Sequence, residues 1–115
     1  MEVRREVVWF AEEMEMRLKA NDYKGGWKDC SPMWLLNRLK EEVRELEDEL
    51  KSQYGFICHC CGHKQEPRKN EAQDIIREAS DVANYAMMIA DIVQKGEGEV
   101  YPWEKSPLVL SMARK

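Results

Sequence analysis

The feature that most constrains the fold is a largely apolar segment inside a long helical pattern. Residues 79–90 read ASDVANYAMMIA, within a helix that we expect from an Asn70 cap to Lys95, closed by Gly96. From Ala79 onward this helix is apolar on most of its faces. A helix of that kind has to be buried between others, so we expect it to be the central helix of a bundle.

Two earlier segments carry the pattern of amphipathic helices. The first runs from about Val3 to Ala20, with apolar residues at every third or fourth position. The second starts at Ser31-Pro32, a helix N-cap followed by proline at the first helical position, and fades near Ser52. Its apolar residues Leu36, Leu39, Val43, Leu46 and Leu50 recur with alternating spacings of three and four, which is typical of bundle packing.

Length and composition agree with a small helical domain. The chain has 115 residues, of which 43% are hydrophobic and 35% charged, with only 6 glycines and 4 prolines. We therefore expect residues 1–115 to form a single all-α domain of three long helices plus a short C-terminal element near Ser106-Pro107. Its apolar excess indicates that oligomerisation completes the bundle.

Net charge and hydropathy limit the kinds of partner and the location that we expect for the chain. The formal net charge is −4, which argues against a nucleic-acid binder, because such proteins carry a basic face. No apolar run is long enough to span a membrane, and the charged N-terminus lacks the apolar region of a signal peptide. We expect a cytoplasmic protein whose four cysteines are thiols or metal ligands.

Acidic residues stand beside the apolar helix faces. Glu78 and Asp81 are three residues apart, and Asp81 is flanked by apolar residues, so it has to be paired, protonated or metal-bound. The third helix offers few cations near Asp81. The second helix presents Glu42 and Glu45 with the same spacing, whereas residues 47–49 are expected to be solvated surface. Two such pairs can converge on Mg²⁺, which prefers oxygen ligands.

The motif pair resembles a known superfamily. Glu42-Val-Arg-Glu45 on one helix and Glu78-Ala-Ser-Asp81 on the next, followed by Val-Ala-Asn, are similar to the all-α nucleoside triphosphate pyrophosphohydrolases, the MazG-like and dimeric dUTPase-like superfamily. The resemblance covers roughly residues 5–93. The gap between the motifs is longer than this family leads us to expect, and the excess falls in a Cys/His-rich loop insertion at about 53–69.

The resemblance implies a reaction and a set of residues. Mg²⁺ or Mn²⁺ bound by the four acids would grip a nucleoside triphosphate, and a water would attack the α-phosphorus to give a nucleoside monophosphate and pyrophosphate. Either Glu41 or Glu45 would orient or deprotonate that water. The family also implies a homodimer or homotetramer. For Trp27, a role in packing is an equal alternative to substrate binding. For Lys24 and Lys28, the alternative is that they are ordinary solvent-exposed lysines. The expected substrate-binding residues are Lys24, Trp27, Lys28, Arg38 and Asn84.

The loop insertion carries a metal-binding spacing. Cys58 and Cys61 form C-x-x-C followed by Gly62, which is similar to one half of a zinc ribbon. His63 is the third expected ligand of a structural Zn²⁺. The fourth ligand is open between Cys30, His59, Cys60 and another chain, and a cysteine-rich loop without metal is the alternative. A redox role is disfavoured, because no thioredoxin-like strand and helix surround the motif.

Three classes of function are compatible with these patterns. The leading one is a metal-dependent nucleotide pyrophosphohydrolase. The second is a zinc-stapled helical binding or regulatory module without catalytic activity, and the third is a bundle with only an assembly role. Release of pyrophosphate from a nucleoside triphosphate separates the first from the other two.

Overall fold

The chain folds into three helices and one small hairpin in a computed structural model that describes residues 1–67 and 71–96. The all-α prediction is thereby confirmed, while the expected C-terminal element lies outside the described residues. The elements are helix α1 (Arg5–Ala20), the short 3₁₀ helix η1 (Asp22–Lys24), helix α2 (Pro32–Tyr54), strands β1 (Phe56–Ile57) and β2 (Lys64–Gln65), and helix α3 (Ala72–Gly96).

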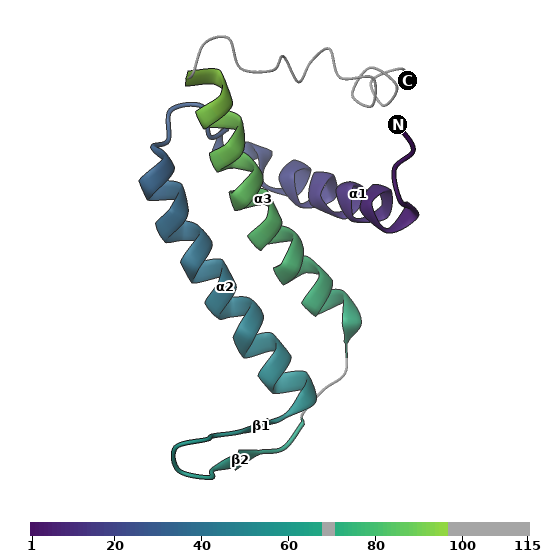
Figure 1. The fold of residues 1–115 in the computed structure, drawn as a ribbon, viewed down its shortest axis with the longest axis vertical. Coiled ribbons are helices and arrows are strands. Elements are labelled where there is room, and N and C mark those ends of the chain that lie inside the picture. Colours follow the sequence, from purple (N-terminus) through teal and green to yellow (C-terminus); the bar gives the residue numbers. More distant parts are fainter. Residues whose placement is uncertain (68–70, 97–115) are drawn as a thin grey trace.

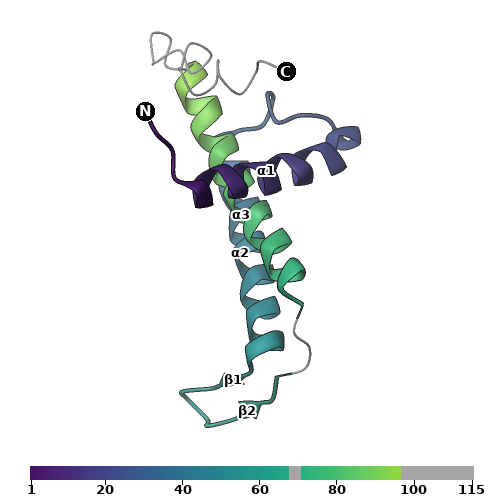
Figure 2. The ribbon, with the colours of Figure 1, turned by 90° about the vertical axis from the view of Figure 1, so that its right-hand side faces the viewer.

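The two long helices form an antiparallel pair that the first helix crosses. Figure 1 shows α2 and α3 side by side, with the hairpin at one end of the pair. Figure 2 shows α1 crossing α3 at a steep angle, in the half of the pair away from the hairpin. Helix α3 contacts both α1 and α2 extensively, so its prediction as the central helix is confirmed.

Local signals fix the ends of α2. The Ser31 side chain accepts a hydrogen bond from the Trp34 amide at 3.1 Å, as an N-cap does. The helix continues two residues beyond the predicted Ser52 and stops at Gly55, whose φ is +83°. A Cβ at Gly55 would lie 2.8 Å from the main-chain oxygen of Gln65, so glycine is required where the helix turns into the hairpin.

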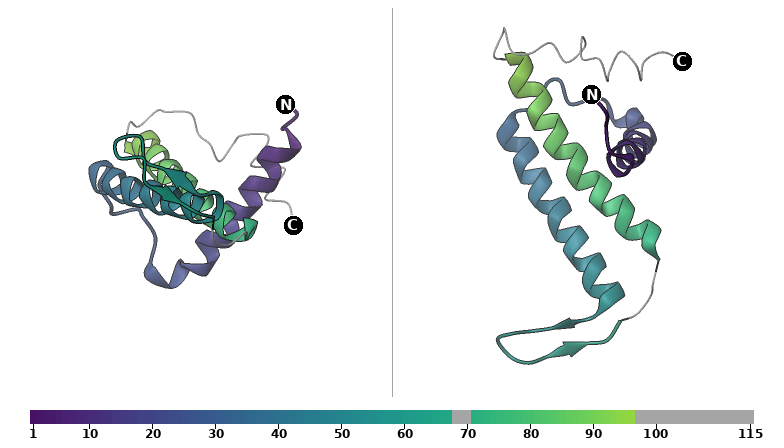
Figure 3. Two further views of the ribbon diagram at one scale, coloured as in Figure 1. Left: turned by 90° about the horizontal axis from the view of Figure 1, so that it is seen from below. Right: turned by 45° about the vertical axis from the view of Figure 1, so that its right-hand side comes forward.

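The connector after α2 is a β-hairpin. Strands β1 and β2 pair antiparallel, with Phe56 opposite Gln65 and Ile57 opposite Lys64. The length of the connector predicted some organisation of its own. Two-residue strands leave too short a pattern to be recognised from sequence. The hairpin extends away from the helices, as the right-hand view in Figure 3 shows.

The core of the single chain is small. Leu35 is the one hydrophobic residue that is fully buried among the described residues. No helix in those residues combines the length and apolar character needed to cross a membrane. Because its buried core is so small, the single chain leaves much of its apolar surface exposed to solvent. Apolar side chains of α1 and α2 that remain exposed include Val7, Val8, Trp9, Met16, Met33, Trp34, Val43 and Leu50.

Candidate metal centre

A cavity of about 600 Å³ lies between the helices. Its volume falls within the range of small-molecule sites. One part of its lining is charged and another is aromatic and apolar. The charged part includes Arg17, Arg38, Glu42, Glu45, Glu78 and Asp81, and the other part includes Trp27, Trp34, Leu35, Tyr85 and Met88.

The acids predicted from sequence meet in this cavity. One carboxylate oxygen from each of Glu42, Glu78 and Asp81 lies within 4.8 Å of the others. Glu45 also lines the cavity, although it stands outside this closest group. The i, i+3 spacing on two facing helices therefore brings the carboxylates together, as the sequence predicted.

Two of these carboxylates are poorly compensated. Glu42 is 7% exposed, and within residues 1–67 and 71–96 neither its Oε2 atom nor that of Glu78 has a hydrogen-bond partner. Burial, together with the adjacent Glu45 carboxyl, raises the pKa of Glu42 to about 7. Burial, followed by the charges of Glu45 and Asp81, also raises the pKa of Glu78. Unpartnered buried oxygens on clustered acids fit a hard divalent cation, because a cation would satisfy both atoms.

Asp81 has a partner that the sequence did not reveal. Arg17 of α1 donates from Nε to Oδ1 at 2.9 Å and from Nη2 to Oδ2 at 3.0 Å. Of the three states that the sequence left open for Asp81, the structure shows the paired one, with a cation that comes from α1 and not from α3. A sequence signal existed, since Arg17 stands seven residues after Phe10 and so shares the apolar face of α1.

The aromatic part of the lining is anchored by hydrogen bonds and ring contacts. The indole nitrogen of Trp27 donates to Asp91 Oδ2 at 2.9 Å, which fixes this ring against α3. The Tyr85 ring centre lies 5.7 Å from the Arg38 guanidinium. Trp34 is 52% exposed although it lines the cavity. The sequence analysis did not predict Trp34 or Tyr85 as site residues. For Trp34, the available signal was its position in the first turn of α2, three residues after the Ser31 cap.

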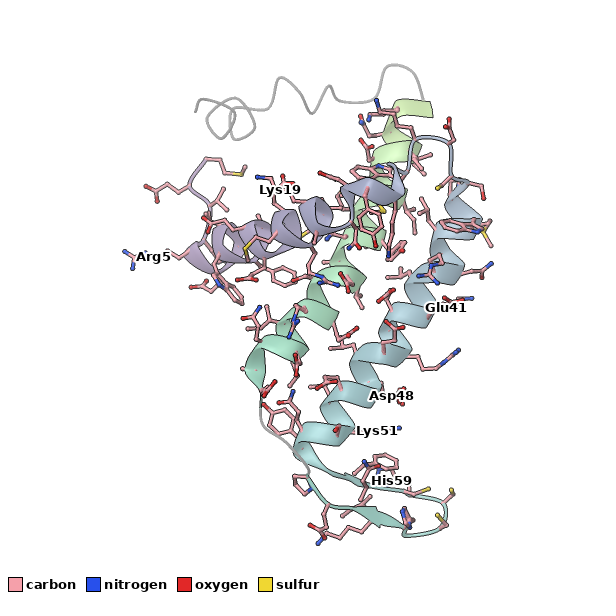
Figure 4. The ribbon with its side chains drawn as sticks, turned by 180° about the vertical axis from the view of Figure 1, so that it is seen from behind. Arg5, Lys19, Glu41, Asp48, Lys51 and His59 are labelled. Atoms are coloured by element: carbon pink, nitrogen blue, oxygen red, sulfur yellow. The ribbon has the colours of Figure 1, made fainter. Side chains whose placement is uncertain are left out.

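The predicted basic residues divide into two groups. Lys24 and Arg38 line the cavity, and Arg38 pairs with Glu41 and, at 3.5 Å, with Glu42. Lys28 is exposed and is not part of the lining. Glu41 is also exposed and outside the lining, on the side of α2 turned away from α3 (Figure 4). Of the two glutamates predicted to activate water, Glu45 is thus the one that the cavity can use.

Asn84 joins the site to α1. The residue is 4% exposed, and its Nδ2 atom donates to the main-chain oxygen of Met14 at 3.0 Å. Its Oδ1 atom is buried and has no hydrogen-bond partner in the part of the chain that the structure describes. Asn84 therefore holds two helices together, lines the cavity and keeps one acceptor unused.

The predicted zinc ligands are only partly gathered. The sulfur atoms of Cys58, Cys60 and Cys61 lie within 4.8 Å of one another, whereas His63 is not part of that group. A hydrogen bond with Cys60 and then bonds from the backbone lower the pKa of Cys58 to about 6. Cys30 lines the cavity and is not part of the cysteine group.

Comparisons of the chain with models of known protein families, with curated proteins and with solved structures found no match. The proposals on function therefore depend on the geometry and chemistry of the cavity.

Proposed function

We propose that the cavity binds a divalent cation and hydrolyses a (deoxy)nucleoside triphosphate between its α- and β-phosphates, as the resemblance to MazG-like proteins implies. The observation that carries this proposal is the group formed by the buried Glu42 and the half-buried Glu78 and Asp81, two of which have an oxygen without a hydrogen-bond partner among the described residues. The adjoining aromatic lining gives the same cavity a surface for a base. Carboxylates next to aromatic rings suit a ligand with phosphates at one end and a planar ring at the other.

Glu42, Glu45, Glu78 and Asp81 would hold Mg²⁺ or Mn²⁺ in this proposal. The cation supplies positive charge for the phosphate oxygens and acidifies a water when it is bound. The residues fit this task because their own charges repel one another and the cavity is partly closed to solvent. Arg17, now paired with Asp81, would move towards the phosphates or stay as an additional cation.

Glu45 is the proposed general base. It lines the cavity outside the closest carboxylate group, so one of its oxygens could take a proton from the attacking water while the other binds the cation. The water oxygen bonds to the α-phosphorus and gives its proton to Glu45, and the bond from that phosphorus to the bridging oxygen breaks. Pyrophosphate leaves with the bridging oxygen, and Lys24 and Arg38 offset its charge.

Base recognition falls to the aromatic lining. Trp27 is fixed by Asp91, so one face of its ring is preorganised for stacking. Trp34 is the more exposed ring and would close over a bound base. The free Oδ1 of Asn84 would accept a hydrogen bond from an amino group of the base or a hydroxyl of the sugar.

The proposal includes a homodimer or homotetramer. The exposed apolar side chains of α1 and α2, among them Trp9 and Val43, support it, because a monomer would leave them in water. Light scattering on the purified chain, coupled to size exclusion, should give a mass about two or four times that of the monomer. A monomer mass at all working concentrations would contradict this part of the proposal.

The decisive test is pyrophosphate release across a panel of nucleoside and deoxynucleoside triphosphates with Mg²⁺, Mn²⁺ or EDTA. We expect turnover of at least one nucleotide, abolished by EDTA and reduced by about 100-fold or more in Glu45→Gln and Asp81→Asn. Asp48→Asn, an exposed acid of the same helix, is the matched control and should keep wild-type turnover. Absence of pyrophosphate release from every nucleotide with both metals would refute the proposal.

A zinc-stapled binding or regulatory module without catalysis is the second candidate. The three clustered cysteines of the hairpin favour it, because the nucleotide reaction does not require them. The binding module and the enzyme predict different results in the same experiments. If the chain is a binding module, no nucleotide is hydrolysed, and function is lost in Cys58→Ser and Cys61→Ser but not in Asp81→Asn.

A further inference from the structure

A second cluster of reactive side chains lies at the tip of the hairpin, apart from the cavity. The sulfur atoms of Cys58, Cys60 and Cys61 converge there, and all three cysteines are free of disulfide bonds. Figure 4 shows sulfur atoms at the end of the hairpin that carries His59. None of these residues lines the cavity, so the proposed nucleotide reaction leaves the cluster unexplained.

The turn of the hairpin has the shape that two-thiolate metal sites use. The Cys58 amide donates to the His63 carbonyl at 2.8 Å, and the Gly62 amide donates to the Cys58 carbonyl at 2.8 Å. Gly62 has a φ of +71°, which closes the turn directly after Cys61. Backbone hydrogen bonds from Cys60 and Cys61 also reach the Cys58 side chain. The backbone therefore folds around the C-x-x-C-G sequence and directs its donors at a sulfur.

The hairpin needs more stabilisation than its own strands provide. Each strand has two residues, and an isolated hairpin of that size is marginal in water. The cluster has little apolar cover, since Cys60 and Cys61 are exposed and Ile57 is 58% exposed. A metal that cross-links the turn would supply binding free energy as folding free energy.

We propose that the hairpin tip binds one Zn²⁺ through the thiolates of Cys58, Cys60 and Cys61, with His63 as the fourth ligand. Three sulfurs that already lie within 4.8 Å need only small side-chain rotations to surround one ion. His63 lies opposite Cys58 across the turn, so the two side chains leave the same face of the hairpin, and we assign the fourth position to His63 on this ground. Three thiolates and one Zn²⁺ leave one negative charge, and the Lys51 ammonium, which is ion-paired with Glu47 at 2.7 Å, also interacts electrostatically with Cys58.

Thiolate chemistry selects zinc over the cation proposed for the cavity. Soft sulfur ligands bind Zn²⁺, whereas carboxylate oxygens bind Mg²⁺ and Mn²⁺. The two sites therefore load independently, and the zinc staples the hairpin at one end of the α2–α3 pair. The inference does not depend on the proposed function.

The test is metal analysis of the full-length wild-type chain purified without chelator. We expect about one zinc per chain, with X-ray absorption showing three sulfurs at about 2.3 Å and one imidazole nitrogen. Cys58→Ser and Cys61→Ser should lose zinc by tenfold or more under the same conditions. Cys30→Ser, whose thiol lies in the cavity lining, is the matched control and should keep its zinc.

Three outcomes would overturn the proposal. The first is a wild-type chain that holds no zinc after incubation with ZnCl₂. The second is a zinc site with two or fewer sulfurs. The third is a disulfide between two of the hairpin cysteines in freshly purified protein. If the serine variants fail to fold by circular dichroism, titration of the metal-free wild type with Co²⁺ decides, because thiolate ligation gives intense charge-transfer absorption and its absence refutes the site.

Discussion

Replacing Glu42 by glutamine tests whether the carboxylate cluster is strained when no metal is present. Glu42 is 7% exposed, and burial with the adjacent Glu45 raises its pKa from 4.5 to about 7. A tenfold change in an equilibrium is about 1.4 kcal/mol, so ionised Glu42 costs the folded state about 3 kcal/mol relative to the unfolded chain. Glutamine has nearly the same shape and carries no charge.

The sign of the pH effect follows from the raised pKa. A group whose pKa is higher in the folded state stabilises the fold fully below its unfolded pKa, and that stability is lost as the pH rises through the folded pKa. In EDTA, the wild-type chain should therefore lose about 2–3 kcal/mol of unfolding free energy between pH 5 and pH 8 from Glu42 alone. Glu42→Gln should lack this loss and be the more stable protein at pH 8.

Urea denaturation followed by circular dichroism, at pH 5 and pH 8 in EDTA, measures the effect. Glu41→Gln is the matched control, because Glu41 is the exposed neighbour and pairs only at the surface with Arg38; its replacement should change stability by less than about 1 kcal/mol at either pH. Addition of Mg²⁺ at pH 8 should stabilise the wild type more than Glu42→Gln. Equal pH dependence in wild type and Glu42→Gln would refute the idea of a strained acidic cluster.

Further variants probe the surrounding structure. Gly55→Ala should destabilise the fold by about 1–3 kcal/mol in urea denaturation, because its Cβ would overlap a hairpin carbonyl; Gly26→Ala, which meets nothing within 4 Å, should be near neutral. Arg17→Met should cost about 1–3 kcal/mol in EDTA, because it leaves Asp81 without its cation, and Mg²⁺ should recover more stability in this variant than in the wild type. Trp27→Phe should cost about 1 kcal/mol through the lost indole hydrogen bond, with a smaller effect contradicting its anchoring role.

The helices were predictable because their signals are local. The Ser31-Pro32 start of α2 depends on one side-chain bond and one fixed φ, both encoded within four residues. The central position of α3 followed from apolar residues on most of its faces, although Ser80 and Asn84 are the two residues of α3 that the single chain buries. The convergence of the acids followed from the i, i+3 spacing once two helices were assumed to face each other.

Features that depend on residues far apart in the chain could not be predicted from the sequence. Arg17 reaches Asp81 across 64 positions, and no local pattern on α3 announces it. The aromatic lining combines Trp27 from a loop with Trp34 and Tyr85 from two helices, so it exists only in the folded chain. The hairpin strands are likewise too short to have a period, although the cysteine spacing in the turn between them was informative.

The Arg17–Asp81 pair neutralises one carboxylate of the cluster and leaves room for a cation at the others. A purely structural explanation would have the cluster neutralised by Arg17, which pairs with Asp81, and by Arg38, which lies 3.5 Å from Glu42 Oε1. Yet among the described residues Glu42 Oε2 and Glu78 Oε2 are buried without a hydrogen-bond donor, and the pKa values of Glu42 and Glu78 are raised despite both arginines. Nε and Nη2 of Arg17 donate to Asp81, and neither arginine donates to these two oxygens. These two carboxylate oxygens lack a compact positive charge between α2 and α3, and a divalent cation would provide it.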